Sequence, residues 1–103
     1  MQNKEYLIVL GEGARKRHRH STEQGRVVAF MVQLEIWQRG VWKPVLRYDS
    51  AHGFSHIDRY NMEGEQEKEI LNFPFGEALS YADLDINENW EEYKRKFMKG
   101  LFP

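Results

Sequence analysis

The chain has 103 residues, of which 41% are hydrophobic, 14% aromatic and 30% charged, and its formal net charge is −1. A chain of this length can bury one modest core, so we expect residues 1–103 to form a single domain. The apolar and aromatic content excludes an intrinsically disordered chain. The absence of cysteine excludes disulfides, thiolate zinc sites and cysteine nucleophiles, and it favours a reducing compartment, the cytoplasm.

Charge is unevenly distributed along the chain. Residues 1–60 hold ten basic and six acidic side chains, and residues 61–103 hold five basic and ten acidic ones. A basic half could meet phosphate and an acidic half a basic partner, although neutralisation within the fold is the commoner meaning of such a split. The apolar run Tyr6–Leu10 is too short for a signal peptide or a membrane span, so we expect no membrane association.

The first part of the chain predicts strands separated by a basic loop. A short strand is expected over Tyr6–Leu10, and residues 14–25 are polar and basic without apolar periodicity, which predicts a loop. Residues 26–37 then show a period of two, which indicates a half-buried strand. Its even positions are all apolar: Val28, Phe30, Val32, Leu34 and Ile36.

A second strand over residues 41–49 is expected to pair with the first as a hairpin. Directly opposed residues share one face of a sheet, and the apolar sets of both strands are even-numbered. This parity requires an odd loop, so residues 38–40 are predicted to form a three-residue turn that places Ile36 opposite Trp42.

Residues 54–62 and 68–71 predict two shorter strands, and from residue 75 the apolar period becomes helical. The members of this stripe are Phe75, Leu79, Ala82, Ile86, Trp90, Tyr93 and Phe97. A helix over residues 75–100 should pack on the apolar face of the hairpin. The predicted fold is α+β, an antiparallel sheet of about four or five strands with a long C-terminal helix on one face.

Five ionisable side chains gather around one predicted turn: Arg47, Asp49, His52, His56 and Asp58. A four-residue loop would put Arg47 opposite His56 on the solvent-exposed face away from the helix, whereas a five-residue loop would turn His56 toward the core. On the open face, the histidines could exchange protons, Arg47 could bind phosphate and an aspartate could orient an imidazole. The competing interpretation is structural, with Asp49 capping the turn and Arg47 pairing with Asp58.

Two further binding hypotheses use the remaining basic and histidine residues. Carboxylates and imidazoles at residues 49–58, together with His18 and His20, could bind a metal, but we expect a site without metal or other cofactor because the spacing is not that of a converging helical pair. The basic run could contact nucleic-acid phosphates or be a solvated loop. Its candidate nucleic-acid-binding residues are Arg15, Lys16, Arg17 and Arg19.

One stretch resembles the TumE family of small prokaryotic proteins. The motifs that carry the resemblance are Arg47-Tyr48-Asp49, Ala51-His52-Gly53, His56-x-Asp58, Glu77-Ala78-Leu79 and Asn89-Trp90-x-x-Tyr93. The family is associated with toxin–antitoxin gene pairs, so the resemblance implies a toxin-like protein with an antitoxin partner. The site positions that carry over are Arg47, Asp49, His52 and His56, while Asp58 stands where another histidine is expected.

Two functions are therefore carried forward. The first is a cytoplasmic, toxin-like protein that acts on RNA, with a metal-independent, ribonuclease-like activity at the Arg/His/Asp cluster. The second is a non-enzymatic module that binds a protein through an acidic helix face or as a homodimer, for which an exposed Trp37 beside Met31 would be a surface. The acidic face would comprise Asp83, Asp85, Glu88 and Glu92.

Overall fold

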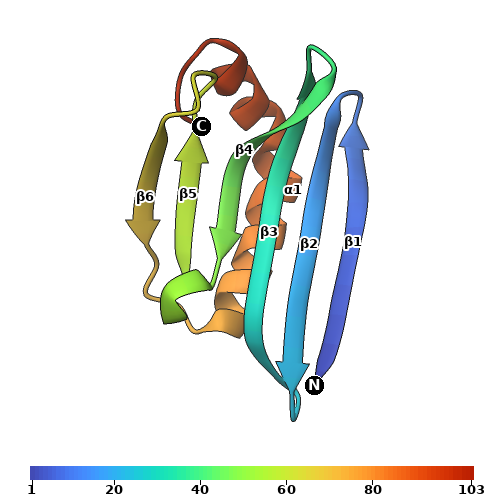
Figure 1. The fold of residues 1–103 in the computed structure, drawn as a ribbon, viewed down its shortest axis with the longest axis vertical. Helices are drawn as coiled ribbons and strands as arrows, with labels where there is room; N and C mark the ends of the chain where they lie inside the picture. The colour runs from blue at the N-terminus through green and yellow to red at the C-terminus, as the bar shows by residue number, and fades with distance from the viewer.

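The computed structural model describes residues 1–103 as one antiparallel sheet with a single long helix across one face (Figure 1). The six strands follow one another in space in the order of the chain. They are β1 (Gln2–Gly11), β2 (Ala14–Glu23), β3 (Arg26–Gln38), β4 (Val41–Asp49), β5 (His56–Tyr60) and β6 (Gln66–Ile70), and the helix is α1 (Phe75–Met98). The α+β class and the helix on one face are confirmed, and the strand number is higher than predicted.

The additional strand is the basic segment that the sequence predicted to be a loop. Residues 14–23 form β2, which pairs with β1 on one side and β3 on the other. The prediction was wrong because both faces of this strand carry charge, so no apolar alternation marks it. Lys16 and His18 point toward α1 and are buried there, while Arg15 and Arg17 point to the opposite face.

The β3–β4 hairpin has a tighter turn than predicted. Arg39 and Gly40 form a two-residue loop with φ angles of 52° and 84°, the left-handed values that such loops require. Trp42 therefore lies opposite Trp37 rather than Ile36. A β-bulge then inserts Val45 as an extra residue in β4, which restores the parity that the sequence argument had assigned to an odd loop.

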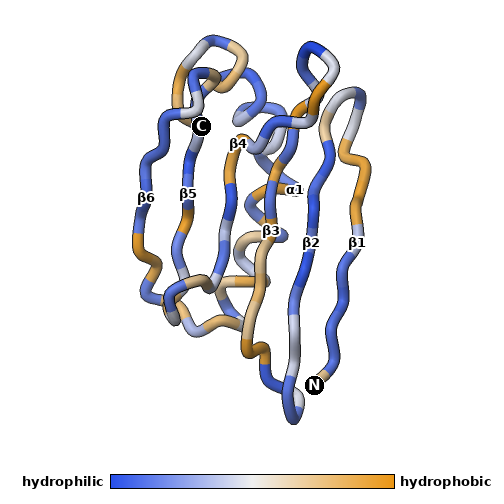
Figure 2. Tube along the Cα trace, viewed as in Figure 1, coloured by the Kyte–Doolittle hydropathy of each residue, from blue (hydrophilic) through white to orange (hydrophobic).

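The core lies between α1 and the centre of the sheet. Phe75–Met98 is continuous and packs mainly against β3 and β4, behind which it runs in Figure 1. The buried core residues of the sheet include Val32, Leu34, Ile36, Leu46, Tyr48 and Ile57, and those of the helix are Ala78, Ala82, Ile86 and Phe97. The strand β1 lies beyond the helix at the edge of the sheet, and its second half is apolar (Figure 2).

Two acidic residues of α1 face the sheet rather than solvent. The Asp85 carboxylate accepts hydrogen bonds from the Tyr48 and Tyr93 hydroxyls at 2.6 and 2.7 Å, and Asp83 pairs with Lys16 at 3.0 Å. Only Glu88 and Glu92 of the predicted acidic partner face remain exposed. Half of that face is therefore used within the fold. The helix lacks the apolar stretch that crossing a bilayer would need.

Candidate functional site

Four of the five predicted site residues form a two-by-two patch on the face away from α1. Asp49 lies directly opposite His56, and Arg47 lies directly opposite Asp58, on the paired strands β4 and β5. The connection has six residues rather than four, but an even loop keeps the parity, so Arg47 and His56 share the open face as predicted. They occupy diagonal positions rather than opposed ones.

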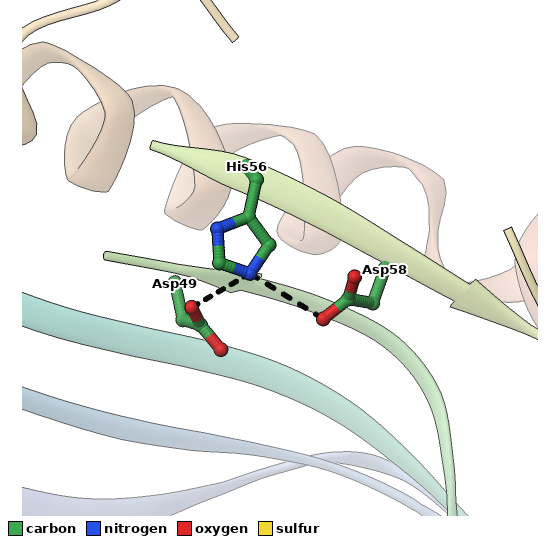
Figure 3. Close-up of side chains that lie close together, drawn as sticks. All are labelled: Asp49, His56 and Asp58. Atoms are coloured by element: carbon green, nitrogen blue, oxygen red, sulfur yellow. Dashed lines mark ion pairs between the residues drawn. The ribbon is translucent and has the colours of Figure 1, made fainter. Parts of the chain in front are cut away.

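His56 is held between two carboxylates (Figure 3). Its Nε2 lies 2.9 Å from Asp49 Oδ1 and 3.5 Å from Asp58 Oδ2, and its Nδ1 lies 3.3 Å from the backbone oxygen of Phe54. Both ring nitrogens therefore face acceptors. These three contacts fix the orientation of the imidazole ring.

The group is more enclosed than the sequence predicted. His56 is 1% exposed and Asp58 3%, whereas the Asp49 side chain is 14% exposed. The rings of His52 and Phe54, from the connection between β4 and β5, lie with centroids 5.8 and 5.6 Å from that of His56. Access is therefore on the Asp49 side, and the predicted exposure to solvent does not extend to His56 and Asp58.

His52 belongs to the short 3-10 turn Ala51–Gly53 rather than to the patch itself. It is exposed, and its φ of 72° is a left-handed value that an ordinary side chain rarely adopts. Asp49 holds this turn by accepting a hydrogen bond from the Ala51 backbone N–H at 2.8 Å. The predicted capping role and the predicted site role of Asp49 are thus compatible.

Arg47 does not pair with Asp58, although the two residues are cross-strand neighbours. Its Nε donates to Gln33 Oε1 at 2.6 Å, and its guanidinium lies 5.7 Å from the centre of the Tyr60 ring. The predicted Arg47–Asp58 ion pair is absent. The Asp58 carboxylate instead lies beside His56 and beside Lys68, whose Nζ is 3.6 Å from Asp58 Oδ1.

Arg15 and Arg17 extend the polar face across the sheet. Both donate to Glu35, at 2.6 and 3.0 Å, and Gln33 Nε2 donates to the same carboxylate at 2.6 Å. Burial alone would raise the pKa of Glu35, but the hydrogen bonds from Arg17, Arg15 and Gln33 outweigh it and hold that pKa below its ordinary value. Glu35 is therefore ionised at neutral pH, and a continuous network links β2 to Arg47.

Arg19 and Asp49 line one cavity of about 250 Å³ at the end of the sheet where β2, β3 and the β4–β5 connection meet. Ser50 and Ala51 also line it, so it reaches the more exposed side of the His56 group. Lys16, the fourth predicted nucleic-acid ligand, lies on the other face, buried against α1. Only three of the four predicted basic residues therefore belong to the open face.

His18 and His20 cannot join the His56 group, because they lie on the helix side of β2. Their ring nitrogens bond each other at 2.7 Å, and His18 Nδ1 lies 3.3 Å from Asp83. The residues that could hold a metal are Asp49, His56 and Asp58, whose candidate ligand atoms lie within 4.8 Å of one another. One oxygen of this group, Asp58 Oδ1, is buried without a hydrogen-bond partner.

The sequence argument missed Gln33, Glu35, Tyr60 and Lys68 as neighbours of the site. A signal was present for two of them. Gln33 and Glu35 are the polar odd positions of a strand whose even positions are apolar, so they had to lie on the same face as Arg47. Tyr60 and Lys68 depended on the β5–β6 register, which the sequence left loose.

Comparison with known proteins gives one match. A family described as a domain of unknown function, DUF7718, matches over residues 1–103. No curated protein and no solved structure matches.

Proposed function

Since the chain belongs to the DUF7718 family, whose description assigns no activity, its function has to be argued from the site, and we propose that it acts on RNA. In this proposal it is a cytoplasmic, toxin-like component of a prokaryotic toxin–antitoxin pair. It binds the phosphodiester backbone across the open face of the sheet and performs its chemistry at the exposed side of the Asp49–His56–Asp58 group, beside His52.

The observation that carries the proposal is the position of this group beside a row of arginines on one open face. Arg17, Gln33, Arg47 and Asp58 are successive cross-strand neighbours from β2 to β5. Arginine presents several donors in a planar fork that matches a phosphate group. A polyanion lying across β2 to β4 would thus be brought to His56.

The residues divide into binding and chemical roles. Arg19 makes no side-chain hydrogen bond or ion pair within the chain and lines the cavity next to Asp49, so its guanidinium is free for a phosphate. His52 is the exposed imidazole of the cluster and is placed to exchange a proton with substrate. His56, engaged at both nitrogens, positions Asp49 rather than meeting substrate itself.

The first experiment measures RNA cleavage by the purified protein and growth of cells in which it is induced. Arg47→Ala should abolish both effects, because a phosphate ligand is lost from the patch. Arg59→Ala is the matched control, since Arg59 lies on the neighbouring strand and pairs with Glu69 at 2.8 Å. Wild-type protein without cleavage or growth effect, or equal activity in the two variants, would sink the proposal.

The second experiment measures RNA affinity against salt concentration by fluorescence anisotropy. Each phosphate contact contributes about one unit to the slope of log K against log salt, so Arg19→Ala should weaken binding and reduce that slope by about one. Arg39→Ala, at the exposed tip of the β3–β4 hairpin, removes an arginine far from the cavity and should leave the slope unchanged. Equal slopes for both variants would remove Arg19 from the interface.

A second candidate function, self-association, is favoured by the edge strand β1. In its apolar run, Tyr6, Leu7, Ile8 and Val9 are exposed, Val9 to 80%, and no strand pairs with their outer edge, while Leu10 packs against the core. The run is symmetric about Ile8, so an antiparallel copy related by a two-fold axis there would oppose apolar residues only. A second copy of this chain is therefore the occupant that the edge fits.

Sedimentation or light scattering decides this candidate. Wild-type protein should have the mass of a dimer, and Ile8→Lys should have the mass of a monomer, because a charge would lie at the two-fold axis. Ile70→Lys, at the opposite edge strand β6, is the matched control and should remain dimeric. A wild-type protein that is monomeric at high concentration would rule the edge contact out.

A further inference from the structure

We propose that Asp49, His56 and Asp58 together bind one divalent transition-metal ion. The proposal rests on the proposed function only for the use of the ion in cleavage, because binding itself depends on the three side chains. It revises the expectation of a site without metal.

The three side chains offer converging donor atoms of suitable kind. The candidate ligand atoms lie within 4.8 Å of one another, and the imidazole nitrogen is 2.9 and 3.5 Å from the two carboxylate oxygens. Metal bonds to nitrogen and oxygen of about 2.0–2.2 Å require donors of one ion to lie within roughly 4.4 Å of one another. Small side-chain adjustments would therefore bring all three onto one ion.

One tautomer of His56, with the proton on Nδ1, fits a ligand role. A metal-binding histidine commonly donates its other ring N–H to a backbone carbonyl, which fixes the orientation of the ring. Here Nδ1 lies 3.3 Å from the Phe54 oxygen, so Nδ1–H can donate there. The lone pair of Nε2 is then directed between Asp49 and Asp58, where an ion would lie (Figure 3).

The charge of the group points to a cation. Two carboxylates are brought together in a site where His56 and Asp58 are buried, and Arg47 bonds Gln33 instead of either. Asp58 Oδ1 has no hydrogen-bond partner, and the Lys68 ammonium is no closer than 3.6 Å. A buried carboxylate with one unbonded oxygen and only a distant ammonium is costly, and an ion bound by Asp58 would lower that cost.

The Asp49–His56–Asp58 group is covered on one side and open to a cavity on the other. The rings of His52 and Phe54 cover His56, while Asp49 borders the cavity that it shares with Arg19. Three protein ligands with a free side are the arrangement in which a catalytic ion keeps a position for water or substrate. One nitrogen and two oxygens suit Mn²⁺ and Zn²⁺. The alternative to a metal ion is a proton on His56 Nε2, which would place an imidazolium between the two carboxylates.

The test measures binding of Mn²⁺ alone to chelator-treated protein, from the loss of the free-ion electron paramagnetic resonance signal, with Zn²⁺ measured by calorimetry. Wild-type protein should bind one ion per chain. Asp58→Asn, which keeps the size of the side chain, and His56→Ala should each lower the affinity by about tenfold or more. The melting temperature of wild-type protein should rise with added ion, and that of the two variants should not.

Glu67→Gln is the matched control, because it removes a carboxylate from the exposed strand β6, opposite Arg59 rather than Asp58. It should bind the ion as wild-type protein does. Circular dichroism establishes that each variant is folded. Absence of binding to wild-type protein at about 1 mM ion, or unchanged binding in folded Asp58→Asn, would overturn the proposal and assign the site to a proton.

These results can be separated from those on RNA. Stoichiometric binding that depends on Asp58, found in a protein that cleaves no RNA, would support this proposal while the proposed function fails. RNA cleavage that persists in chelator-treated protein lacking any affinity for either ion would do the reverse. The binding measurement contains no RNA, so its failure cannot be caused by choosing the wrong substrate.

Discussion

The two faces of the sheet bury polar groups by different means. On the helix side, Lys16, His18 and Tyr48 find their partners on α1, at Asp83 and Asp85. On the open side, partners come from neighbouring strands, as Gln33 does for Arg47 and as Asp49 and Asp58 do for His56. Polar contacts on the helix side join two layers, whereas those on the open side stay within the sheet, where the helix does not cover them.

Breaking the apolar core of the helix side should have the largest effect. Leu34 lies at the centre of β3 and is fully buried against α1. Leu34→Ala should lower the free energy of unfolding by about 3 kcal/mol, because it removes buried methyl groups and leaves a cavity. Urea unfolding measures the change. Val41→Ala, at a side chain that is 51% exposed, should change it by less than about 0.5 kcal/mol. Similar losses in the two variants would mean that the core is not where the structure puts it.

The polar contacts between layers should come next. Tyr48 donates a hydrogen bond to Asp85 at 2.6 Å. Burial, and to a smaller extent this hydrogen bond, raises the pKa of the Tyr48 hydroxyl, which therefore stays protonated. Tyr48→Phe should therefore cost about 1–2 kcal/mol of unfolding free energy. Tyr81→Phe is the control, since the exposed Tyr81 packs beside Tyr48 without a hydroxyl bond of its own. A loss in Tyr81→Phe as large as that in Tyr48→Phe would assign the effect to ring packing.

The hydrogen-bond network of the open face should contribute less to the free energy of unfolding at neutral pH, and its contribution should decrease in acid. Glu35→Gln removes the charge that Arg15 and Arg17 share and should cost about 1 kcal/mol. Because the folded-state pKa of Glu35 is lowered, its stabilisation is present above the ordinary value of 4.5 and is lost as pH falls through the folded-state value. The difference between wild-type and variant in urea unfolding should thus shrink in acid. A difference that stays constant with pH would show that the carboxylate charge is not responsible.

Sequence reasoning succeeded where one face of an element was apolar and failed where both faces were polar. The stripe from Phe75 to Phe97 and the even positions of β3 each predicted their element, and the even loop parity predicted the shared face of Arg47 and His56. The strand β2 was not recognised because Lys16 and His18 are buried against Asp83, a polar partner that lies 65 residues or more away from both. Such a partner cannot be recognised from local periodicity.

The register of the β3–β4 hairpin could not be predicted from the sequence either. A two-residue turn and the bulge at Val45 together mimic the parity of a three-residue turn, so hydrophobic alternation cannot distinguish the two arrangements. The same limit applies to the site. Parity placed Arg47 and His56 on one face, but the enclosure of His56 by His52 and Phe54 depends on how a six-residue connection folds back over the sheet.

The smallest effect expected is a pH dependence on the helix side. Burial lowers the pKa of His18, Lys16 and His20 lower it further, and Asp83 of α1 opposes them, while the Tyr6 ring stacks on the imidazole from β1. A lowered folded-state pKa means that the unfolded chain takes up a proton first. The contribution of His18 is therefore present above the ordinary value of 6.5 and is lost as pH falls toward the folded-state value.

Urea unfolding at about pH 7.5, 6.5 and 5.5 measures this loss, and His18→Asn should flatten it because the titrating ring is gone. Asp83→Asn provides the sharper comparison. It removes the one neighbour that raises the pKa of His18, so the gap between folded and unfolded pKa should widen and stability should fall more steeply in acid. A flatter profile in Asp83→Asn would mean that Asp83, rather than burial, governs the charge of His18. Polar partners would then outweigh burial on the helix side, as they do for Glu35 on the open side.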